Sequence, residues 1–150
     1  MDKSNKELLK KAVDYLKSLH FDVENIMVTG SIALDEQGIL PAGRKAHDVD
    51  FIIKMDDTTW KYLKLWEAIN AVENDKLMFS SSKYENTVFL KHDDVMLNIW
   101  KYNQFSDWSD IKDADTGVYV ATVNHIIIAK KMYGRDKDFK DINEIVKNLL

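Results

Sequence analysis

The chain has 150 residues, of which 45% are apolar and 31% charged, with a formal net charge of −4 at pH 7 and no cysteine. This balance is typical of a globular protein, and we expect one compact domain over residues 1–150. The lack of cysteine excludes disulfides and thiolate metal sites. The mild acidity gives no sign of a broad nucleic-acid surface, although a local basic patch stays open.

Charged residues recur throughout the first 16 residues, "MDKSNKELLKKAVDYL", and this is not the pattern of a signal peptide. No apolar run approaches the length that spans a membrane. We therefore expect a soluble, cytoplasmic protein with no membrane partner.

The N-terminal half predicts alternating helices and strands. Leucine, alanine and valine recur at helical spacing over residues 5–19, after a capping box from Ser4 to Glu7. A strand, a short helix and a second strand follow at 24–30, 31–37 and 48–54. Asp57 or Thr58 then caps a helix. The predicted buried face of that helix is Tyr62, Leu65, Trp66, Ile69 and Val72.

The C-terminal half predicts strands followed by two helices. The strands are expected at 76–80, 86–91 and 95–102, with a polar loop and an extended piece at 105–117 and 118–122. Gly134 ends a helix over 124–133, and Asp136 caps the last helix. Its predicted inward residues are Phe139, Ile142, Ile145, Val146 and Leu149. The order indicates an α+β fold: a mixed β-sheet flanked by helices, with two C-terminal helices.

Two carboxylates in the strand "DVDFII" need an explanation. Side chains alternate along a strand, so Asp48 and Asp50 share one face while Val49 and Phe51 share the other. Two ionised carboxylates on one face repel each other. A bound Mg²⁺ would offset that charge, since it prefers one or two carboxylates completed by substrate phosphates and waters.

The turn at Gly30 and Ser31 fits the same chemistry. It follows a strand and opens a short helix, where glycine lets the backbone approach a ligand and free N–H groups can hold a phosphate. Together the turn and the aspartates predict a nucleoside triphosphate bound as its magnesium complex. Each piece also has an ordinary structural interpretation, a capped turn or a solvated strand face, and it is the ordered combination that is specific.

The ordered motif, Val28-Thr29-Gly30-Ser31 followed by Asp48-Val49-Asp50-Phe51, resembles the nucleotidyltransferase superfamily with the polymerase-β-like fold. The longer form "GSIAL…GRKAHDVDF" is most similar to the small transferases of the abortive-infection toxin type, from toxin–antitoxin systems, and of the antibiotic-modifying type. The resemblance implies two Mg²⁺ ions held with the nucleotide by Asp48 and Asp50. It also implies nucleotide contacts from Gly30, Ser31 and Arg44.

The resemblance extends to the C-terminal segment "HIIIAKKMYGRDKDFKDI". In relatives, charges such as those of Lys130, Arg135, Asp138 and Asp141 close the nucleotide cleft or tie the last helices to it, and Lys130 is implied as a nucleotide contact. The alternative is a solvated pair of helices with ion pairs along each helix.

The chain departs from the family at one catalytic position. Relatives carry a third carboxylate on a later strand, and the matching residue here is Asn98. An amide oxygen can coordinate a metal, but it cannot act as a base at neutral pH. Asp93 and Asp94 lie nearby, and a solvated hairpin turn explains them better.

Three functions stay open at this stage. The chain is a transferase that moves a nucleoside monophosphate from a triphosphate to a hydroxyl, a weakened copy that still binds nucleotide, or a catalytically inactive module for protein interaction or structure. The acceptor is open between a small molecule, tRNA and a protein. A protein partner or a homo-oligomer is also open, because Trp108 is expected to be exposed. His47 is interpreted as structural.

Overall fold

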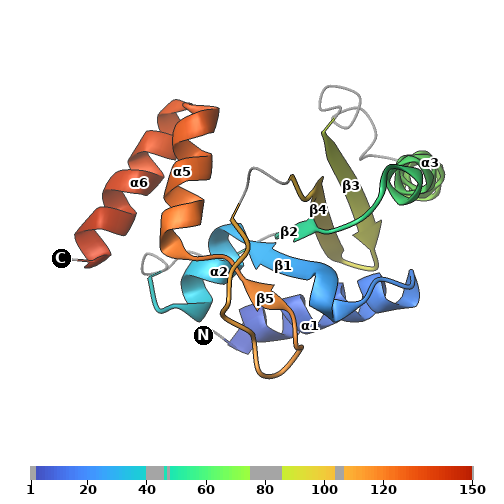
Figure 1. The fold of residues 1–150 in the computed structure, drawn as a ribbon, viewed down its shortest axis with the longest axis horizontal. Helices are drawn as coiled ribbons and strands as arrows, with labels where there is room; N and C mark the ends of the chain where they lie inside the picture. Colours follow the sequence, from blue (N-terminus) through green and yellow to red (C-terminus); the bar gives the residue numbers. More distant parts are fainter. Residues whose placement is uncertain (1–2, 40–45, 47, 75–85, 104–106, 150) are drawn as a thin grey trace.

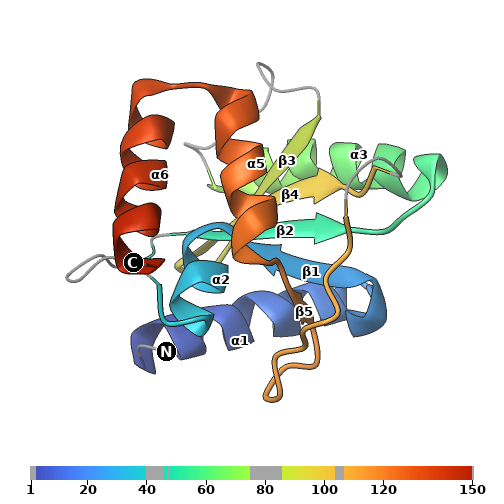
Figure 2. The ribbon, with the colours of Figure 1, turned by 60° about the vertical axis from the view of Figure 1, so that its left-hand side comes forward.

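A computed structural model describes residues 3–39, 46, 48–74, 86–103 and 107–149. It is an α+β fold with a five-stranded mixed sheet in the order β3-β4-β2-β1-β5, and helices lie around it (Figures 1 and 2). The predicted fold class is confirmed, including the two C-terminal helices.

The sheet is built around a parallel pair of central strands. Its strands are β1 (Ile26–Thr29), β2 (Asp48–Ile53), β3 (Thr87–His92), β4 (Val95–Lys101) and β5 (Tyr119–Val120). Strand β2 pairs in parallel with β4 and antiparallel with β1. Strands β3 and β4 form an antiparallel hairpin, and β5 adds to β1 in parallel.

The helices are α1 (Lys3–Ser18), the single turn η1 (Val23–Asn25), α2 (Gly30–Glu36), α3 (Asp57–Asn74), α5 (Val123–Tyr133) and α6 (Asp136–Leu149). Helix α1 already begins at Lys3, so the predicted capping box from Ser4 to Glu7 is wrong and these residues lie inside the helix. Gly134 ends α5 in the left-handed conformation as predicted. The strand predicted at 76–80 lies outside the described residues.

One face of the sheet forms the core against α1. Strand β2 alternates between half-buried and buried residues, because Asp48 begins the half-buried set and Val49 the buried set. The buried side chains of α1 and β2 that meet there are Leu9, Val13, Leu16, Val49, Phe51 and Ile53. This packing leaves Asp48 and Asp50 on the opposite face of the same strand.

Helix α3 faces the sheet with a different side from the predicted one. Tyr62, Leu65 and Ile69 are 68%, 62% and 51% exposed, while Glu67 and Asn70 are buried. Trp66 is half-buried, with its indole N–H donating to the hydroxyl of Tyr15 at 2.9 Å, and the side chain of Val72 lies outside the described set. The apolar period identified a helix correctly and assigned its buried face wrongly.

The position of α3 at the edge of the sheet explains why its polar side faces inward. Strand β3 is an edge strand, and α3 lies alongside it (Figure 1). The side chain of Asn70 bonds both the N–H and the carbonyl of Lys91, each at 2.9 Å. Glu67 accepts the N–H of Phe89 at 2.6 Å, and Lys64 donates to the carbonyl of Thr87 at 2.7 Å. A polar face therefore covers backbone groups of β3 that an edge strand otherwise exposes.

The predicted inward face of the last helix is only partly right. Ile145 is buried, whereas Phe139, Val146 and Leu149 are 49%, 41% and 54% exposed. Ile142 is half-buried. The hydrophobic stripe of α6 is wider than the surface that packs against α5 and the rest of the fold, so part of the stripe stays exposed.

Trp108 is not an isolated exposed tryptophan. It is half-buried, and its ring makes edge contacts with Tyr102 and Tyr119 at centroid distances of 5.3 and 5.5 Å. The ammonium group of Lys54 lies 4.2 Å from its ring centre. The expectation that Trp108 is exposed is therefore wrong, and its part in an interface stays a prediction. In the part of the chain that the structure describes, no helix is both long and apolar enough to cross a membrane.

Replacing Asn70 by alanine tests the covering of the edge strand. Asn70→Ala removes the hydrogen bonds that the Asn70 side chain makes to the N–H and the carbonyl of Lys91. Because Asn70 is buried, the free energy of unfolding should fall by ~1–3 kcal/mol. Asn143→Ala makes the same chemical change at an exposed position of α6, and it should change stability by less than ~0.5 kcal/mol. Urea unfolding measures both variants. Equal losses would show that the contacts between α3 and β3 contribute nothing specific.

Candidate active site

Three side chains meet on the face of the sheet opposite α1. The parallel pairing of β2 with β4 sets Asp50 beside Asn98 and Asp48 beside Met96. The amide nitrogen of Asn98 donates to Asp48 Oδ2 at 2.5 Å and to Asp50 Oδ1 at 2.8 Å. Asn98 is only 8% exposed. One amide therefore bridges two carboxylates that would otherwise repel each other.

The backbone at Gly30 lies directly against this cluster. Thr29 pairs with Asp50 across β1 and β2, and α2 starts at the next residue. A Cβ added at Gly30 would lie 3.2 Å from Cγ of Asp50 and well inside contact with Oδ2. Gly30 also has φ of +66°, which side chains disfavour. Only glycine lets the start of α2 approach the carboxylate this closely.

Burial and the neighbouring charge of Asp48 raise the pKa of Asp50 to about 6. The hydrogen bond from Asn98 opposes that shift, as do the positive charges of Lys130 and Lys137. Ionisation of Asp50 is therefore unfavourable at this site, and the nearby lysine cations make it less unfavourable. Lys137 belongs to the charged C-terminal segment that the resemblance associates with the nucleotide cleft, although it was not expected to contact the nucleotide.

Lys130 is held between the two C-terminal helices. Its ammonium group donates to Asp141 Oδ2 at 2.9 Å, joining α5 to α6. Asp138, 1% exposed, receives the Arg135 guanidinium at 2.7 and 3.1 Å, and this hydrogen bonding lowers the pKa of Asp138. Asp138 is therefore not a solvated charge, although its pair with Arg135 is local to the start of α6, as the alternative interpretation expected. The pair between Lys130 and Asp141 joins the two helices whose charges act on Asp50.

Of the other residues singled out from the sequence, Arg44 and His47 fall outside the described residues. Ser31 is half-buried in the first turn of α2. Asp93 and Asp94 are exposed at the β3–β4 turn, where Asp93 has φ of +54°, as expected of a solvated hairpin.

Asp48, Asp50 and Asn98 provide two carboxylates and one amide on one face of the sheet. Within the described ranges, no three carboxylate or histidine side chains gather as a metal site. Asp48 and Asp50 could hold Mg²⁺, which is commonly bound by one or two carboxylates and completed by substrate phosphates and water.

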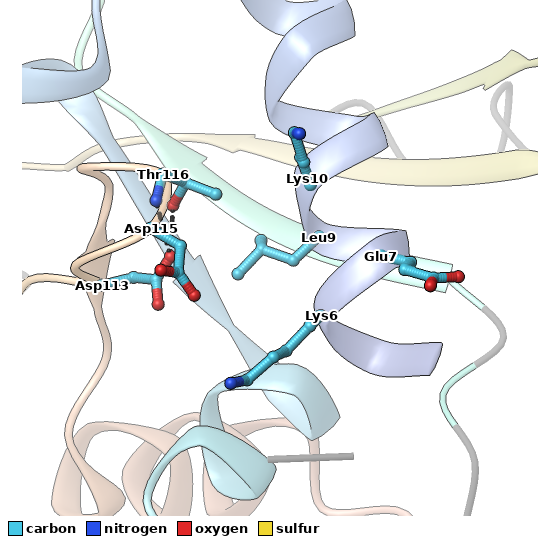
Figure 3. Close-up of a pocket in the computed structure, with 7 residues that line it drawn as sticks. All are labelled: Lys6, Glu7, Leu9, Lys10, Asp113, Asp115 and Thr116. Carbon is cyan, nitrogen blue, oxygen red and sulfur yellow. Dashed lines mark hydrogen bonds between the residues drawn. The ribbon is translucent and has the colours of Figure 1, made fainter. Parts of the chain in front are cut away.

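A separate cavity of about 350 Å³ lies between α1 and the loop before β5 (Figure 3). It is lined by Lys6, Glu7, Leu9, Lys10, Asp113, Asp115 and Thr116. Beyond it, Glu36 has a buried oxygen with no hydrogen-bond partner among the described residues. Burial is the main cause that raises the pKa of Glu36 to about 6, and the neighbouring side chain of Asp113 adds to the rise. None of the three site residues on β2 and β4 lines this cavity, so its chemistry is distinct from the carboxylate site.

No protein-family model, curated protein or solved structure matches this chain.

Two glycines give a matched test of the contact between Gly30 and Asp50. Gly30 and Gly38 have φ of +66° and +74°, so alanine is strained at both, but a Cβ at Gly38 meets nothing within 4 Å. Gly38→Ala should cost ~1 kcal/mol, and Gly30→Ala at least ~1 kcal/mol more because of overpacking against the carboxylate. Chemical denaturation compares them. Equal costs would mean that α2 can move away from Asp50 freely.

Asp50→Asn should change how stability depends on pH. Because the pKa of Asp50 is higher in the folded state than in the unfolded state, its ionisation destabilises the fold as pH rises from about 4 to 6. Above pH 6 in metal-free buffer the variant should be ~2 kcal/mol more stable than wild type. At pH 4 the two proteins should be alike. A difference that is the same at both pH values would contradict a raised pKa.

Proposed function

We propose that this chain is a magnesium-dependent nucleotidyltransferase that moves a nucleoside monophosphate from a triphosphate to a hydroxyl acceptor. The observation that carries the proposal is the meeting of Asp48, Asp50 and Asn98 beside the close approach of Gly30. Gly30, Asp48 and Asp50 belong to the motif on which the resemblance to the polymerase-β-like superfamily rests, and Asn98 is the position at which the chain departs from it.

Each residue would have a defined task. Asp48 and Asp50 would hold magnesium together with the triphosphate, and the ion when bound would offset charge on the phosphate oxygens. The backbone of Gly30 and Ser31 would contact the phosphates beside Asp50. Thr29 makes no side-chain hydrogen bond to the start of α2, which leaves this role to a ligand.

Positive charge near the site supports an anionic substrate. Lys130 and Lys137 both lower the cost of negative charge at Asp50. Lys130 is kept in place by Asp141, so its position does not depend on a ligand. A triphosphate in front of β2 would meet cations from α5 and α6 and glycine backbone from α2.

Asn98 favours a second candidate function, a nucleotide-binding module without efficient catalysis. Its amide donates hydrogen bonds to both carboxylates, and it cannot take a proton from an attacking hydroxyl. In an active enzyme that proton would pass to water or to a substrate phosphate oxygen. The two candidates share the nucleotide site and differ in turnover.

Calorimetric titration with each nucleoside triphosphate, with and without Mg²⁺, tests the shared site. Wild type should bind one triphosphate only when Mg²⁺ is present. Asp48→Asn should weaken binding at least ~10-fold, since it removes one of two charged ligands. Asp94→Asn removes the same charge at the exposed β3–β4 turn and should bind like wild type. Magnesium-independent binding, or equal affinity in all three proteins, would contradict the proposal.

Asn98→Asp in the same experiment separates the two candidates. It should tighten Mg²⁺ binding, and its melting temperature in chelator should fall because three carboxylates then repel one another. If a missing base limits the reaction, transfer of labelled nucleotide to a panel of small-molecule, tRNA and protein acceptors should rise ~10²–10⁴-fold. Tighter binding without any transfer would favour the nucleotide-binding module.

A further inference from the structure

The side-chain amide of Asn98 meets the two carboxylates of the candidate site as a hydrogen-bond donor. Its nitrogen donates to Asp48 Oδ2 at 2.5 Å and to Asp50 Oδ1 at 2.8 Å. An amide nitrogen has two N–H groups, and both are used by this pair. The carbonyl oxygen of the same amide, which is the atom that can coordinate a metal, is not the atom that contacts the carboxylates.

The other oxygen of Asp50 lies against backbone. A Cβ at Gly30 would collide with Asp50 Oδ2, so this oxygen packs closely on the residue where α2 begins. Asp50 and Asn98 are register partners on adjacent strands, and the neighbouring residues Val49 and Phe51 are buried in the core. A cation shared by Asp48 and Asp50 therefore has to use the Asp50 oxygen that Asn98 already holds.

An N–H donor and a cation compete for such oxygens. A divalent cation repels the positively polarised hydrogen atoms of the amide, so Mg²⁺ gains the carboxylate pair only when the hydrogen bonds from Asn98 are broken. Hydrogen bonds to charged groups contribute more than bonds between neutral groups. Their loss therefore lowers the net free energy of binding the ion. A carboxylate at residue 98 would attract the ion, whereas the amide opposes it.

We infer that Asn98 competes with Mg²⁺ for Asp48 and Asp50, so that the ion alone binds weakly and displaces the amide only together with the phosphates of its substrate. Phosphates add oxygen ligands to Mg²⁺, and these extra bonds offset the lost hydrogen bonds. Asn98 is then a positioning residue that sets the order in which ion and substrate bind. The inference rests on the magnesium site of the proposed function and adds this control to it.

Titration with Mg²⁺ alone, at pH 8 and constant ionic strength, tests the competition. Asn98→Ala removes the competing donor, so its affinity for Mg²⁺ should be at least ~10-fold above that of wild type, about the factor that one hydrogen bond to a charged group represents. Asn70→Ala removes another buried amide, which bonds Lys91 at the β3 edge, and it should bind Mg²⁺ like wild type. Calorimetry and the rise of melting temperature with Mg²⁺ concentration measure all three proteins.

A double variant shows where the gained affinity comes from. Asp48→Asn added to Asn98→Ala should abolish the gain, since it removes one of the two carboxylates. In chelator, Asn98→Ala should melt below wild type, because Asp48 and Asp50 then repel each other without their shared donor. A purely structural role of Asn98 would make the variant both less stable and weaker in binding Mg²⁺, whereas competition makes it less stable and tighter in binding.

The amide signal of Asn98 reports its displacement directly. In ¹⁵N–¹H spectra of wild type, the side-chain signals that disappear in Asn98→Ala should shift at saturating Mg²⁺, whereas those of Asn70 should stay. An unchanged Asn98 signal, or Mg²⁺ affinity in Asn98→Ala that is equal to or weaker than that of wild type, would overturn the inference. Affinity that survives Asp48→Asn would overturn it as well.

Failure of the proposed function is a separate result. In that case Asn98→Ala would gain affinity for Mg²⁺ as inferred, but wild type would bind no nucleoside triphosphate in the presence of the ion. If wild type binds the triphosphate with Mg²⁺ and Asn98→Ala binds Mg²⁺ less tightly, the proposed function holds and the amide is a metal ligand, which overturns the competition.

Discussion

The organisation of this protein depends on two carboxylates placed on one face of a central strand. Asp48 and Asp50 lie on β2, whose other face is in the core, so neither can turn away from its neighbour without losing the packing of Val49 and Phe51. The amide of Asn98 reduces their repulsion by donating to both. The parallel register of β2 and β4 is what delivers that amide. Burial still raises the pKa of Asp50 to about 6.

This constraint reaches the surrounding elements. The closeness of the α2 start to Asp50 requires glycine at residue 30. On the other side, the ion pair between Lys130 and Asp141 joins α5 to α6, and the contacts of Arg135 with Asp138 stabilise the start of α6. These helices carry the positive charges that act on Asp50. A ligand bearing both a cation and phosphates would satisfy the carboxylates and the lysines together, and this complementarity is the physical basis of the proposed activity.

At the β3 edge of the sheet, the constraint is the exposure of backbone groups. An edge strand exposes backbone donors and acceptors to other chains, and α3 covers those of β3 with Glu67 and Asn70. Because the polar side of the helix is used in this way, its apolar side faces outward. The covering of the β3 edge thus leaves the apolar side chains of Tyr62, Leu65 and Ile69 exposed on α3.

Local pattern was enough for the fold class and for much of the candidate site. Period-two alternation placed Asp48 and Asp50 on one face, because alternation is a property of any strand. Asn98 was expected beside them from the family resemblance, and the parallel register of β2 and β4 brings it there. The glycine at residue 30 was equally visible as a break between strand and helix. Hydrophobic period also located α3 and α6, since the spacing of apolar residues depends on the helix alone.

Only the tertiary structure decided which side of each helix is buried. The stripe of Tyr62, Leu65 and Ile69 was expected inside and lies outside, because hydrogen bonds from α3 to an edge strand outweigh the apolar period, and no sequence pattern shows where the edge of a sheet will be. The meeting of Glu36 with Asp113 was likewise not predictable, since these residues are far apart in the chain. The sequence by itself determined the helices and strands and the residue types on each strand face. The packing of the helices around the sheet decided which helix sides are buried or exposed, because that depends on contacts between residues far apart in the chain.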